Sequence, residues 1–388
     1  MVTPLLNRCM RIELVSTFCR FAELRDDWNR LADGIPMRSW EWAYTWAETM
    51  LGDGKLMLFV GKDDDDRVVG IAPFYLSSHW LRGDVIRFLG DRQCCTDYTT
   101  ILAHPDHTDV FLEKVARSLA ENSVGHTLTN LDLLTSESNV WLGWDLIHLE
   151  GIDQSDAVMK QFIQQMSSED CTVNWRSTYS SWQTTFNGTW EEYVSGLSKS
   201  QRRNVRLVQR RLLDAEDVAV HEATDSQSLA YGMKWFRVLH QKRWESEGKP
   251  GCFANPEFAT FLYQIAERLF DNGSLRVLWI EKSGTPIGVD FSFLSEMTSY
   301  GYQMGIDPEF RDQEIGRALL VAAMKSTHQS GRVNFDFLRG DERYKSRWGG
   351  AARPLLDVEI VPDRSLPQLR QNLVDFGRGV KQRLTRSE

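Results

Sequence analysis

The sequence predicts an α/β (mixed α+β) fold of two tandem domains, each with a mixed central β-sheet flanked by helices. Short apolar runs typical of strands alternate with helix-length amphipathic segments along the whole chain. The length of 388 residues exceeds what one hydrophobic core usually organises. A similar order of elements also occurs twice, with the prolines Pro105 and Pro308 lying 203 residues apart. These observations predict domains at residues 1–170 and 171–388.

The repeat begins with a predicted hairpin in each half, formed by runs 56–60 and 68–74 and by runs 275–280 and 286–291. The first pair flanks Asp63–Asp66, which we interpret as a solvated turn because it lacks the spacing of a calcium loop. A strand, a helix and a strand then follow in both halves: 98–105, 109–121 and 131–134, and 302–308, a helix from Gly316, and 335–338. We therefore expect two copies of one unit, with a strand at 182–186 passing between them.

Composition argues against several classes of protein. A net charge of −9 and an isoelectric point near 5.5 disfavour a surface built as a whole to bind DNA or anionic lipid. The six cysteines include no C-x-x-C pair, so neither a metal site nor a disulfide framework is expected. No run of about 18 uncharged apolar residues predicts a membrane span, and the N-terminus lacks the apolar core of a signal peptide. We expect a soluble cytoplasmic protein without a metal.

The most informative segment is a loop between the predicted strand 302–308 and a predicted helix. It has the sequence Gln313-Glu314-Ile315-Gly316-Arg317-Ala318. A glycine at a helix start lets the backbone approach a ligand, and the free N–H groups and positive dipole end there attract anions. We therefore predict that this loop binds a pyrophosphate. The first half has Glu113 where the second has Gly316, so only the second half is expected to bind one.

This loop resembles the phosphate-binding motif of the GNAT acetyltransferase superfamily, which reads Gln or Arg, two residues, Gly, one residue, Gly or Ala. The resemblance runs over residues 306–320. Farther on, Tyr344-Lys345-Ser346-Arg347-Trp348-Gly349 is similar to the helix start that carries a tyrosine before the last strands of that superfamily. The expected second domain is therefore similar to a GNAT domain.

Most of the chain resembles one branch of that superfamily more closely, the tandem GNAT proteins named as cellulose-biosynthesis-type acetyltransferases and related to FemABX peptidyltransferases. The segments that carry this resemblance are 39–42, 72–75, 202–206, 239–244 and 336–345. The loop departs from the branch at Glu314-Ile315, where Ser-Pro is often found. The resemblance implies two tandem GNAT-like domains, of which the first is degenerate.

The resemblance also implies an N-acyltransferase. The donor would be acetyl-CoA or another acyl-CoA, and the acceptor an amino group of a sugar, an amino acid or a cell-envelope or polysaccharide precursor. Backbone groups of the strand would bind pantetheine or polarise the thioester, and the loop would hold the pyrophosphate, which gives this set of cofactor residues: Met304, Gly305, Ile306, Gln313, Glu314, Ile315, Gly316, Arg317 and Ala318.

Three residues are predicted to carry the chemistry. Tyr344 would protonate or stabilise the departing thiolate, because a phenol has a pKa near 10 and a thiol one near 8.5. Asp336 or Asp290 would act as the base, directly or through water. Two of these residues also have a structural interpretation. Tyr344 could be a core aromatic residue, and Asp336 could be the partner of a nearby arginine.

Five residues are predicted to contact the acceptor: Arg203, His240, Arg243, Arg339 and Lys345. Arg203 lies in segment 199–211, which carries six basic residues and no acidic one. This is expected for a site that binds a nucleotide-sugar, lipid-phosphate or tRNA-like acceptor, or for a solvated helix face. His240 is as compatible with a buried position between aromatic residues. Arg339 and Lys345 are as compatible with stabilising a loop.

Two other functions remain open at this point. A FemABX-like transferase would use aminoacyl-tRNA as donor, and a non-catalytic GNAT-fold protein would bind a ligand in a polysaccharide system. The intact Gln313, Gly316 and Tyr344 favour an enzyme over the second of these. Binding of tRNA is expected only under the first.

Overall fold

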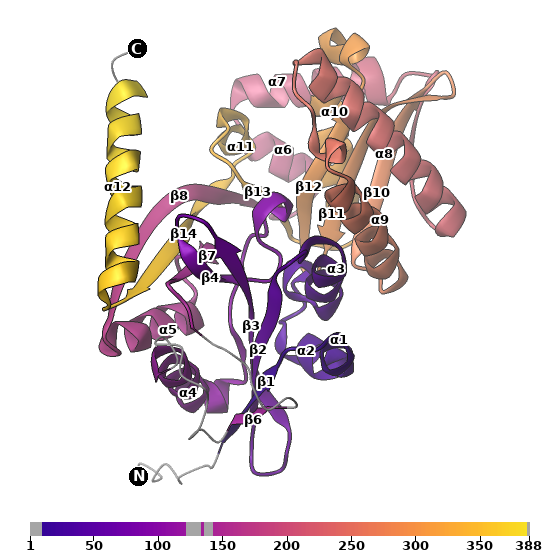
Figure 1. Cartoon of the computed structure of the whole chain (residues 1–388). Coiled ribbons are helices and arrows are strands. Elements are labelled where there is room, and N and C mark those ends of the chain that lie inside the picture. Colours follow the sequence, from indigo (N-terminus) through magenta and orange to yellow (C-terminus); the bar gives the residue numbers. More distant parts are fainter. Residues whose placement is uncertain (1–9, 122–132, 136–142, 386–388) are drawn as a thin grey trace. The chain divides into compact units, whose positions relative to one another are not determined.

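The chain forms two compact units in the computed structural model, which describes residues 10–121, 133–135 and 143–385 (Figure 1). Unit 1 comprises the described parts of 1–33, 37–178 and 355–388. Unit 2 comprises 34–36 and 179–354, and all its residues are described. Each unit contains a mixed sheet with helices, which confirms the predicted fold class.

Unit 1 has the strand order β6-β1-β2-β3-β4-β7-β14, and helices cover both faces of this sheet (Figure 1). Its strands are β1 Arg11–Val15, β2 Lys55–Lys62, β3 Val68–His79, β4 Gly83–Phe88, β5 Leu102–Ala103, β6 Leu133–Thr135 and β7 Leu146–Asp153. Its helices are α1 Phe18–Glu23, α2 Arg25–Leu31, α3 Trp40–Met50, α4 Thr108–Glu121, α5 Ala157–Ser168 and α12 Ser365–Thr385.

Unit 2 has the strand order β8-β13-β12-β11-β10-β9. Its strands are β9 Val218–Glu222, β10 Leu275–Lys282, β11 Thr285–Leu294, β12 Thr298–Ile306 and β13 Asn334–Arg339, together with the end of β8 Cys171–Thr185. Its helices are α6 Trp190–Gly196, α7 Lys199–Val208, α8 Ser226–Ser246, α9 Pro256–Asp271, α10 Ile315–Gln329 and α11 Arg343–Arg347.

The two units share one plan. In each, an outer strand joins a long hairpin and a third antiparallel strand, and a further strand then pairs in parallel with that third one. The predicted hairpins and tandem organisation are therefore confirmed.

The predicted matching of strands was wrong. The partner of β12 in the plan is β4, because β4 is the strand that pairs with the hairpin, whereas 98–105 holds only the two-residue β5. The partner of β13 is β7, which runs parallel to β4, whereas β6 pairs with β1. Residues 131 and 132 of the predicted strand lie outside the described residues. The order of apolar runs could not distinguish these pairings, which depend on register.

The chain passes from unit 1 to unit 2 within β8 and returns within β14 Ala351–Pro362. The predicted division at 170/171 differs from this because residues 355–388 pack in unit 1. Two contacts explain the return: β14 pairs with β7, and Glu359 on β14 accepts a hydrogen bond from Arg378 of α12 at 2.9 Å.

Most helices of unit 2 begin with a residue whose side chain caps the first turn. Ser198, Asp225 and Asn255 accept from the backbone N–H groups of Gln201, Ser228 and Phe258, at the starts of α7, α8 and α9. Helix α10 is different, because Glu314 before it has a left-handed backbone with φ +58° and caps no N–H group with its side chain. The first turn of α10 is thus left for another acceptor.

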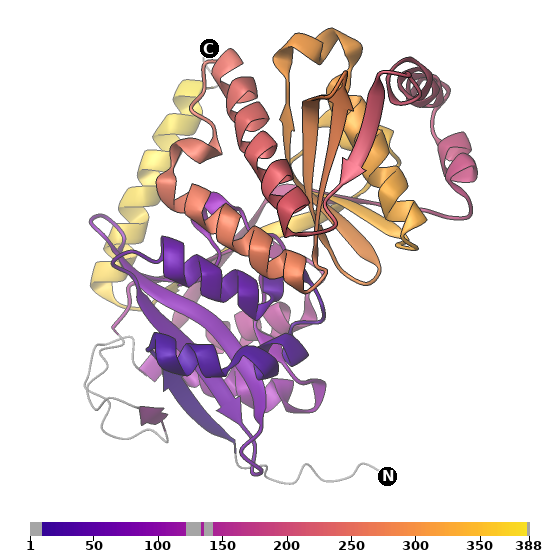
Figure 2. The same cartoon turned by 90° about the vertical axis from the view of Figure 1, so that its right-hand side faces the viewer.

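The sheet of unit 2 has α8 on one face and α10 on the other, as Figure 2 shows. Gly305 of β12 allows α8 to pack closely on the sheet, because a Cβ there would lie only 2.7 Å from the backbone nitrogen of His240 on α8. Gly288 of β11 faces α10, where a Cβ would lie 3.2 Å from Ile315. Residues of one strand therefore alternate between the α8 face and the α10 face.

A buried ion pair lies between the sheet and α10. Arg276 Nη2 is 3.9 Å from Asp290 Oδ2, and both residues are almost fully buried, at 2 % and 0 % exposure. Arg276 also donates to Thr327 of α10 at 3.0 Å, and Ser292 donates to Asp290 at 2.6 Å. Burial raises the pKa of Asp290 to about 6, and the charge of Arg276 opposes this shift.

We expect the substitution Asp290→Leu to lower the free energy of unfolding by about 3–5 kcal/mol, because it leaves the Arg276 charge buried without the carboxylate that pairs with it. Urea unfolding checks this. The double variant Arg276→Met with Asp290→Leu should recover most of the loss, since a well-packed apolar pair carries no desolvation cost. The interpretation would be contradicted if the double variant lost as much free energy of unfolding as the two single variants together.

Candidate active site

The candidate site of unit 2 lies where two parallel strands stop pairing. Strands β12 and β13 are joined only from Thr298–Tyr300 to Asn334–Asp336. Beyond that point β12 continues to Ile306 paired with β11 alone, and β13 continues to Arg339 beside β8. On the side that faces β13, the stretch Met304–Ile306 of β12 therefore has no partner strand, and its backbone N–H and C=O groups can meet a ligand.

A β-bulge lies at the start of this opening. Phe291 of β11 pairs with Gln303 and Ser292 pairs with Gly301, so Tyr302 is an extra residue on β12. A bulge twists its strand and changes the direction of the groups beside it. It contributes to the separation of the end of β12 from β13.

The loop before α10 meets this same end of β12. Residues Pro308–Gln313 form a 3₁₀ turn, and Glu314 then turns the chain into the helix. The nearest atom to a Cβ built at Gly316 is Ile306 Cδ1 of β12, at 4.0 Å. The chain itself therefore leaves the space in front of Gly316 open, and its packing does not explain a glycine at this position.

The predicted cofactor residues differ in what their side chains do. Ile315 and Ala318 pack into the core beneath α10, so only their backbones can face a ligand. Met304 and Ile306 are partly buried against the same core. Glu314 forms an ion pair with Arg317, and Gln313 is exposed. Gly305 packs closely against α8.

Salt bridges attach this loop to α8. Lys242 lies 2.8 Å from Asp307 and 2.9 Å from Glu309, and Arg311 lies 3.5 Å from Glu247. Sequence analysis missed these pairs, because the partners are more than 60 residues apart and no periodicity connects them. These ion pairs fix the position of the segment that leads into α10.

His240 is buried on the α8 face of β12, with 1 % exposure. Its Nε2 accepts from the Trp244 indole at 2.9 Å, and the rings of Phe236 and Phe253 pack against it. Burial lowers the pKa of His240 to about 4, with a smaller contribution from Arg243, so this side chain is neutral. These contacts give His240 a structural role on this face.

Tyr344 stands on the short helix α11 beyond β13, with its ring 6.2 Å from that of Phe337. The residue as a whole is 44 % exposed, but desolvation raises the pKa of its hydroxyl to about 12. Glu342 contributes to the increase, and Arg243 of α8 opposes it. Tyr344 and Arg243 are thus brought within electrostatic reach of each other.

Asp336 of β13 has no exposed surface. Its Oδ1 accepts from Ser181 at 2.8 Å and from the backbone N–H of Leu338 at 2.7 Å. Leu338 has φ +54°, so this carboxylate stabilises a left-handed residue at the end of the strand. Asp290 is not brought to the opening, because it faces α10.

Lys345 holds the loop that follows β13. Its ammonium donates to the carbonyls of Leu338, Arg339 and Gly340 at 3.0, 2.7 and 3.1 Å, and the residue is 2 % exposed. Arg339 contributes to the same loop through its backbone. Arg203 lies elsewhere, exposed on α7.

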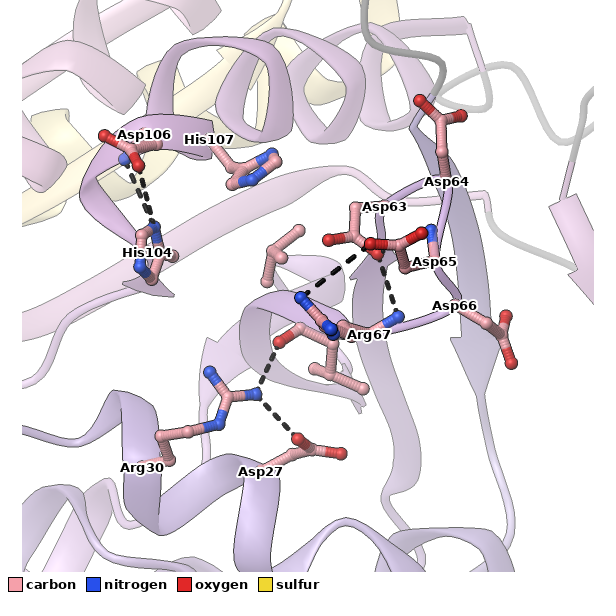
Figure 3. A pocket seen from close by; sticks show the side chains of 12 residues that line it. Asp27, Arg30, Asp63, Asp64, Asp65, Asp66, Arg67, His104, Asp106 and His107 are labelled. Atoms are coloured by element: carbon pink, nitrogen blue, oxygen red, sulfur yellow. Dashed lines mark hydrogen bonds and ion pairs between the residues drawn. The ribbon is translucent and has the colours of Figure 1, made fainter.

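A depression of about 900 Å³ in unit 1 surrounds the turn Asp63–Asp66 (Figure 3). Asp63 accepts the backbone N–H groups of Asp65 and Arg67 at 3.0 and 2.9 Å, so this carboxylate closes the turn. The prediction of a hairpin turn is confirmed. Among the described residues, no group of three or more histidine, cysteine or acidic side chains is arranged to hold a metal ion.

Comparison with known proteins places unit 2 in a class. Residues 199–346 match the family model described as Acetyltransferase (GNAT) domain. Unit 2 therefore contains a GNAT acetyltransferase domain, and the resemblance stated from the sequence is confirmed. A search of curated proteins found no significant match.

Solved structures extend the likeness to both units. The structure of FemX has a TM-score of 0.60 at 12 % identity, over 90 % of this chain and 97 % of that chain. The C-terminal domain of a putative lysylphosphatidylglycerol synthetase from Agrobacterium fabrum has a TM-score of 0.54 at 8 % identity, over 93 % and 96 %. L-PGS from Bacillus licheniformis has 0.50 at 10 % identity, over 92 % and 96 %. At these identities the likeness concerns the fold alone.

Within the described parts of the chain, no helix combines the length and apolar character that crossing a membrane requires.

We expect Lys345→Met to lower the free energy of unfolding by about 3 kcal/mol, because one buried carbonyl and two partly buried carbonyls lose a charged donor. Hydrogen exchange should show faster exchange in residues 338–342. Arg347→Met, on the exposed side of the same helix, is the matched control and should change neither quantity. Equal effects of the two substitutions would contradict a specific role for Lys345.

Proposed function

We propose that unit 2 transfers an acyl group, acetyl in the simplest case, from coenzyme A to the amino group of a small acceptor. The observation that carries the proposal is the open space before Gly316, at an uncapped helix start beside the free edge of β12. A pyrophosphate fits the helix start, and an extended chain with amide groups, such as pantetheine, fits an unpaired strand edge.

The proposal assigns Met304, Gly305 and Ile306 to pantetheine through their backbones, and Gln313–Ala318 to the pyrophosphate. The amine attacks the thioester carbonyl, the carbon–sulfur bond breaks, and the sulfur leaves as a thiolate. The hydroxyl of Tyr344 donates a hydrogen bond to that sulfur. With a pKa of about 12 it remains protonated at neutral pH, and it stabilises a thiolate more readily than it gives up its proton.

The acceptor side is proposed at the end of α8. Arg243 lies within electrostatic reach of Tyr344 and stacks on Trp244 at 5.4 Å, which suits a guanidinium that recognises a carboxylate or phosphate on the acceptor. Asp336 and Asp290 have no exposed surface, so the proposal gives neither a direct proton-transfer step and leaves the amine proton to water. A cytoplasmic location is part of the proposal, because acyl-CoA is found there.

The substitution Gly316→Trp should abolish binding of acetyl-CoA, because an indole would fill the space at the helix start. Calorimetric titration with acetyl-CoA checks this. Gly196→Trp is the matched control, because a Cβ at Gly196 meets nothing within 4 Å and this residue lies at the end of α6. The site is assigned wrongly if acetyl-CoA binds Gly316→Trp and the wild type equally well.

The substitution Tyr344→Phe should lower kcat by about 100-fold or more and leave the Kd of acetyl-CoA unchanged, because the hydroxyl acts on the leaving group. Tyr231→Phe, on the outer face of α8, is the control. Since the pKa of Tyr344 is raised to about 12, the wild-type rate should show no decline between about pH 8 and 10 from this group. An alkaline decline that disappears in Tyr344→Phe would contradict the raised pKa.

A second candidate keeps the fold and changes the donor to aminoacyl-tRNA. The likeness in fold to FemX favours it, because FemX belongs to the FemABX group implied by the sequence. Titration with uncharged tRNA beside acetyl-CoA separates the two candidates: binding of tRNA without binding of any acyl-CoA selects the second, and the reverse selects the first. Binding of neither favours a non-catalytic protein.

A further inference from the structure

We propose that unit 2 carries a second anion site, separate from the start of α10, that binds the phosphate groups of a diphosphate-bearing ligand. The site is a groove of about 400 Å³ between α6, α7 and α10, which we name the α7 groove. Its basic residues are Arg206 and Arg210 from the α7 segment and Lys325 from α10. The proposal does not depend on acyl transfer.

The charges of this groove are not neutralised within unit 2. Lys199, Arg203, Arg206 and Arg210 follow one another along the exposed side of the helix at spacings of four, three and four residues. All residues of unit 2 are described, and none forms an ion pair with any of these four or with Lys325. By contrast, Lys242, Lys282, Arg311 and Arg317 of the same unit all pair with carboxylates. An unpaired basic stripe in a chain of net charge −9 indicates an external anion.

The acidic residues at the groove do not cancel these charges. Asp214 accepts from the amide of Gln209 at 2.6 Å, and Glu191 makes no ion pair within the unit. Their distance from the guanidinium groups exceeds that of a salt bridge. The groove is therefore basic as a whole, with polar groups at its margin.

Packing fixes the direction of the stripe. Val205 and Val208 are buried at 3 % exposure on the opposite side of α7, so its arginines cannot turn inward. The helix then continues as a π-helical turn, Gln209–Leu213, which holds Arg210 at the groove. Turns of this kind are rare and occur frequently at functional sites.

The groove is too far from the start of α10 to share one diphosphate with it. Lys325 lies ten residues after Ile315, which corresponds to about 15 Å along an α-helix. A neighbouring depression of about 320 Å³ shares Gln209 and Lys325 with the groove and adds His221, Glu222 and Ser326. This depression has room for the polar group of the ligand that is attached to the phosphates.

Two closely spaced arginines and a lysine suit a diphosphate, because guanidinium groups bind phosphate oxygens in pairs. The same chemical group occurs on soluble nucleotides and on lipid head groups. Inorganic pyrophosphate tests the chemistry, and vesicles of phosphatidylcholine with and without diacylglycerol diphosphate test the lipid source.

Calorimetric titration with pyrophosphate compares four proteins. The wild type should bind, and the double variant Arg206→Gln with Arg210→Gln should bind at least about tenfold more weakly through the loss of charged hydrogen bonds. Gly316→Trp, which blocks the start of α10, should keep the binding that the groove provides. Lys234→Gln with Arg237→Gln removes two exposed charges from α8 and should have no effect.

The proposal is overturned if pyrophosphate does not bind the wild type, or binds the Arg206–Arg210 variant undiminished. It is also overturned if Gly316→Trp alone removes all binding, which would place the anion at α10. Sedimentation with vesicles that contain diacylglycerol diphosphate, lost in the Arg206–Arg210 variant, supports a lipid source. The absence of such sedimentation beside pyrophosphate binding supports a soluble source. Binding of a short RNA without any binding of pyrophosphate would overturn the proposal in favour of a nucleic-acid surface.

Discussion

The site of unit 2 depends on one feature of backbone pairing, the end of the parallel ladder between β12 and β13. The two strands share hydrogen bonds over three residue pairs and then separate, so β12 has a free edge in the middle of a sheet. A free edge is a liability unless a ligand or another strand satisfies it. The bulge at Tyr302 and the turn after β13 support the separation, and the start of α10 lies at its end.

Most charged groups near the opening maintain this geometry. Lys345 holds the loop after β13, Asp336 stabilises its left-handed residue, and Lys242 attaches the loop before α10 to α8. A buried charge with several partners is expensive to place and rigid once placed. In the proposed function, the groups that meet the substrate are backbone amides, the hydroxyl of Tyr344 and the guanidinium of Arg243. The proposed chemistry at a thioester, which is already an activated acyl group, requires little more.

The likeness to FemX and to lysylphosphatidylglycerol synthetases concerns the fold, since identities of 8–12 % leave the sites free to differ. The donor must therefore be inferred from the site itself. Open space before Gly316 favours a compact pyrophosphate at the helix start. The α7 groove adds a second concentration of positive charge on another side of α10, and its ligand is a separate question from the donor.

The sequence by itself determined the fold class and both hairpins, and it predicted an anion site at the loop before α10. These inferences follow from local patterns: apolar runs that flank turns, helix-length amphipathic segments and a glycine at a helix start. Sequence analysis could not decide which strand pairs with which, so β6 was matched to β13 although β7 has that place. It also could not decide which of two faces Asp290 takes, or that Lys345 and Asp336 are enclosed. Only tertiary structure decides these points, because register, burial and the partner of a charge depend on residues far apart in the chain.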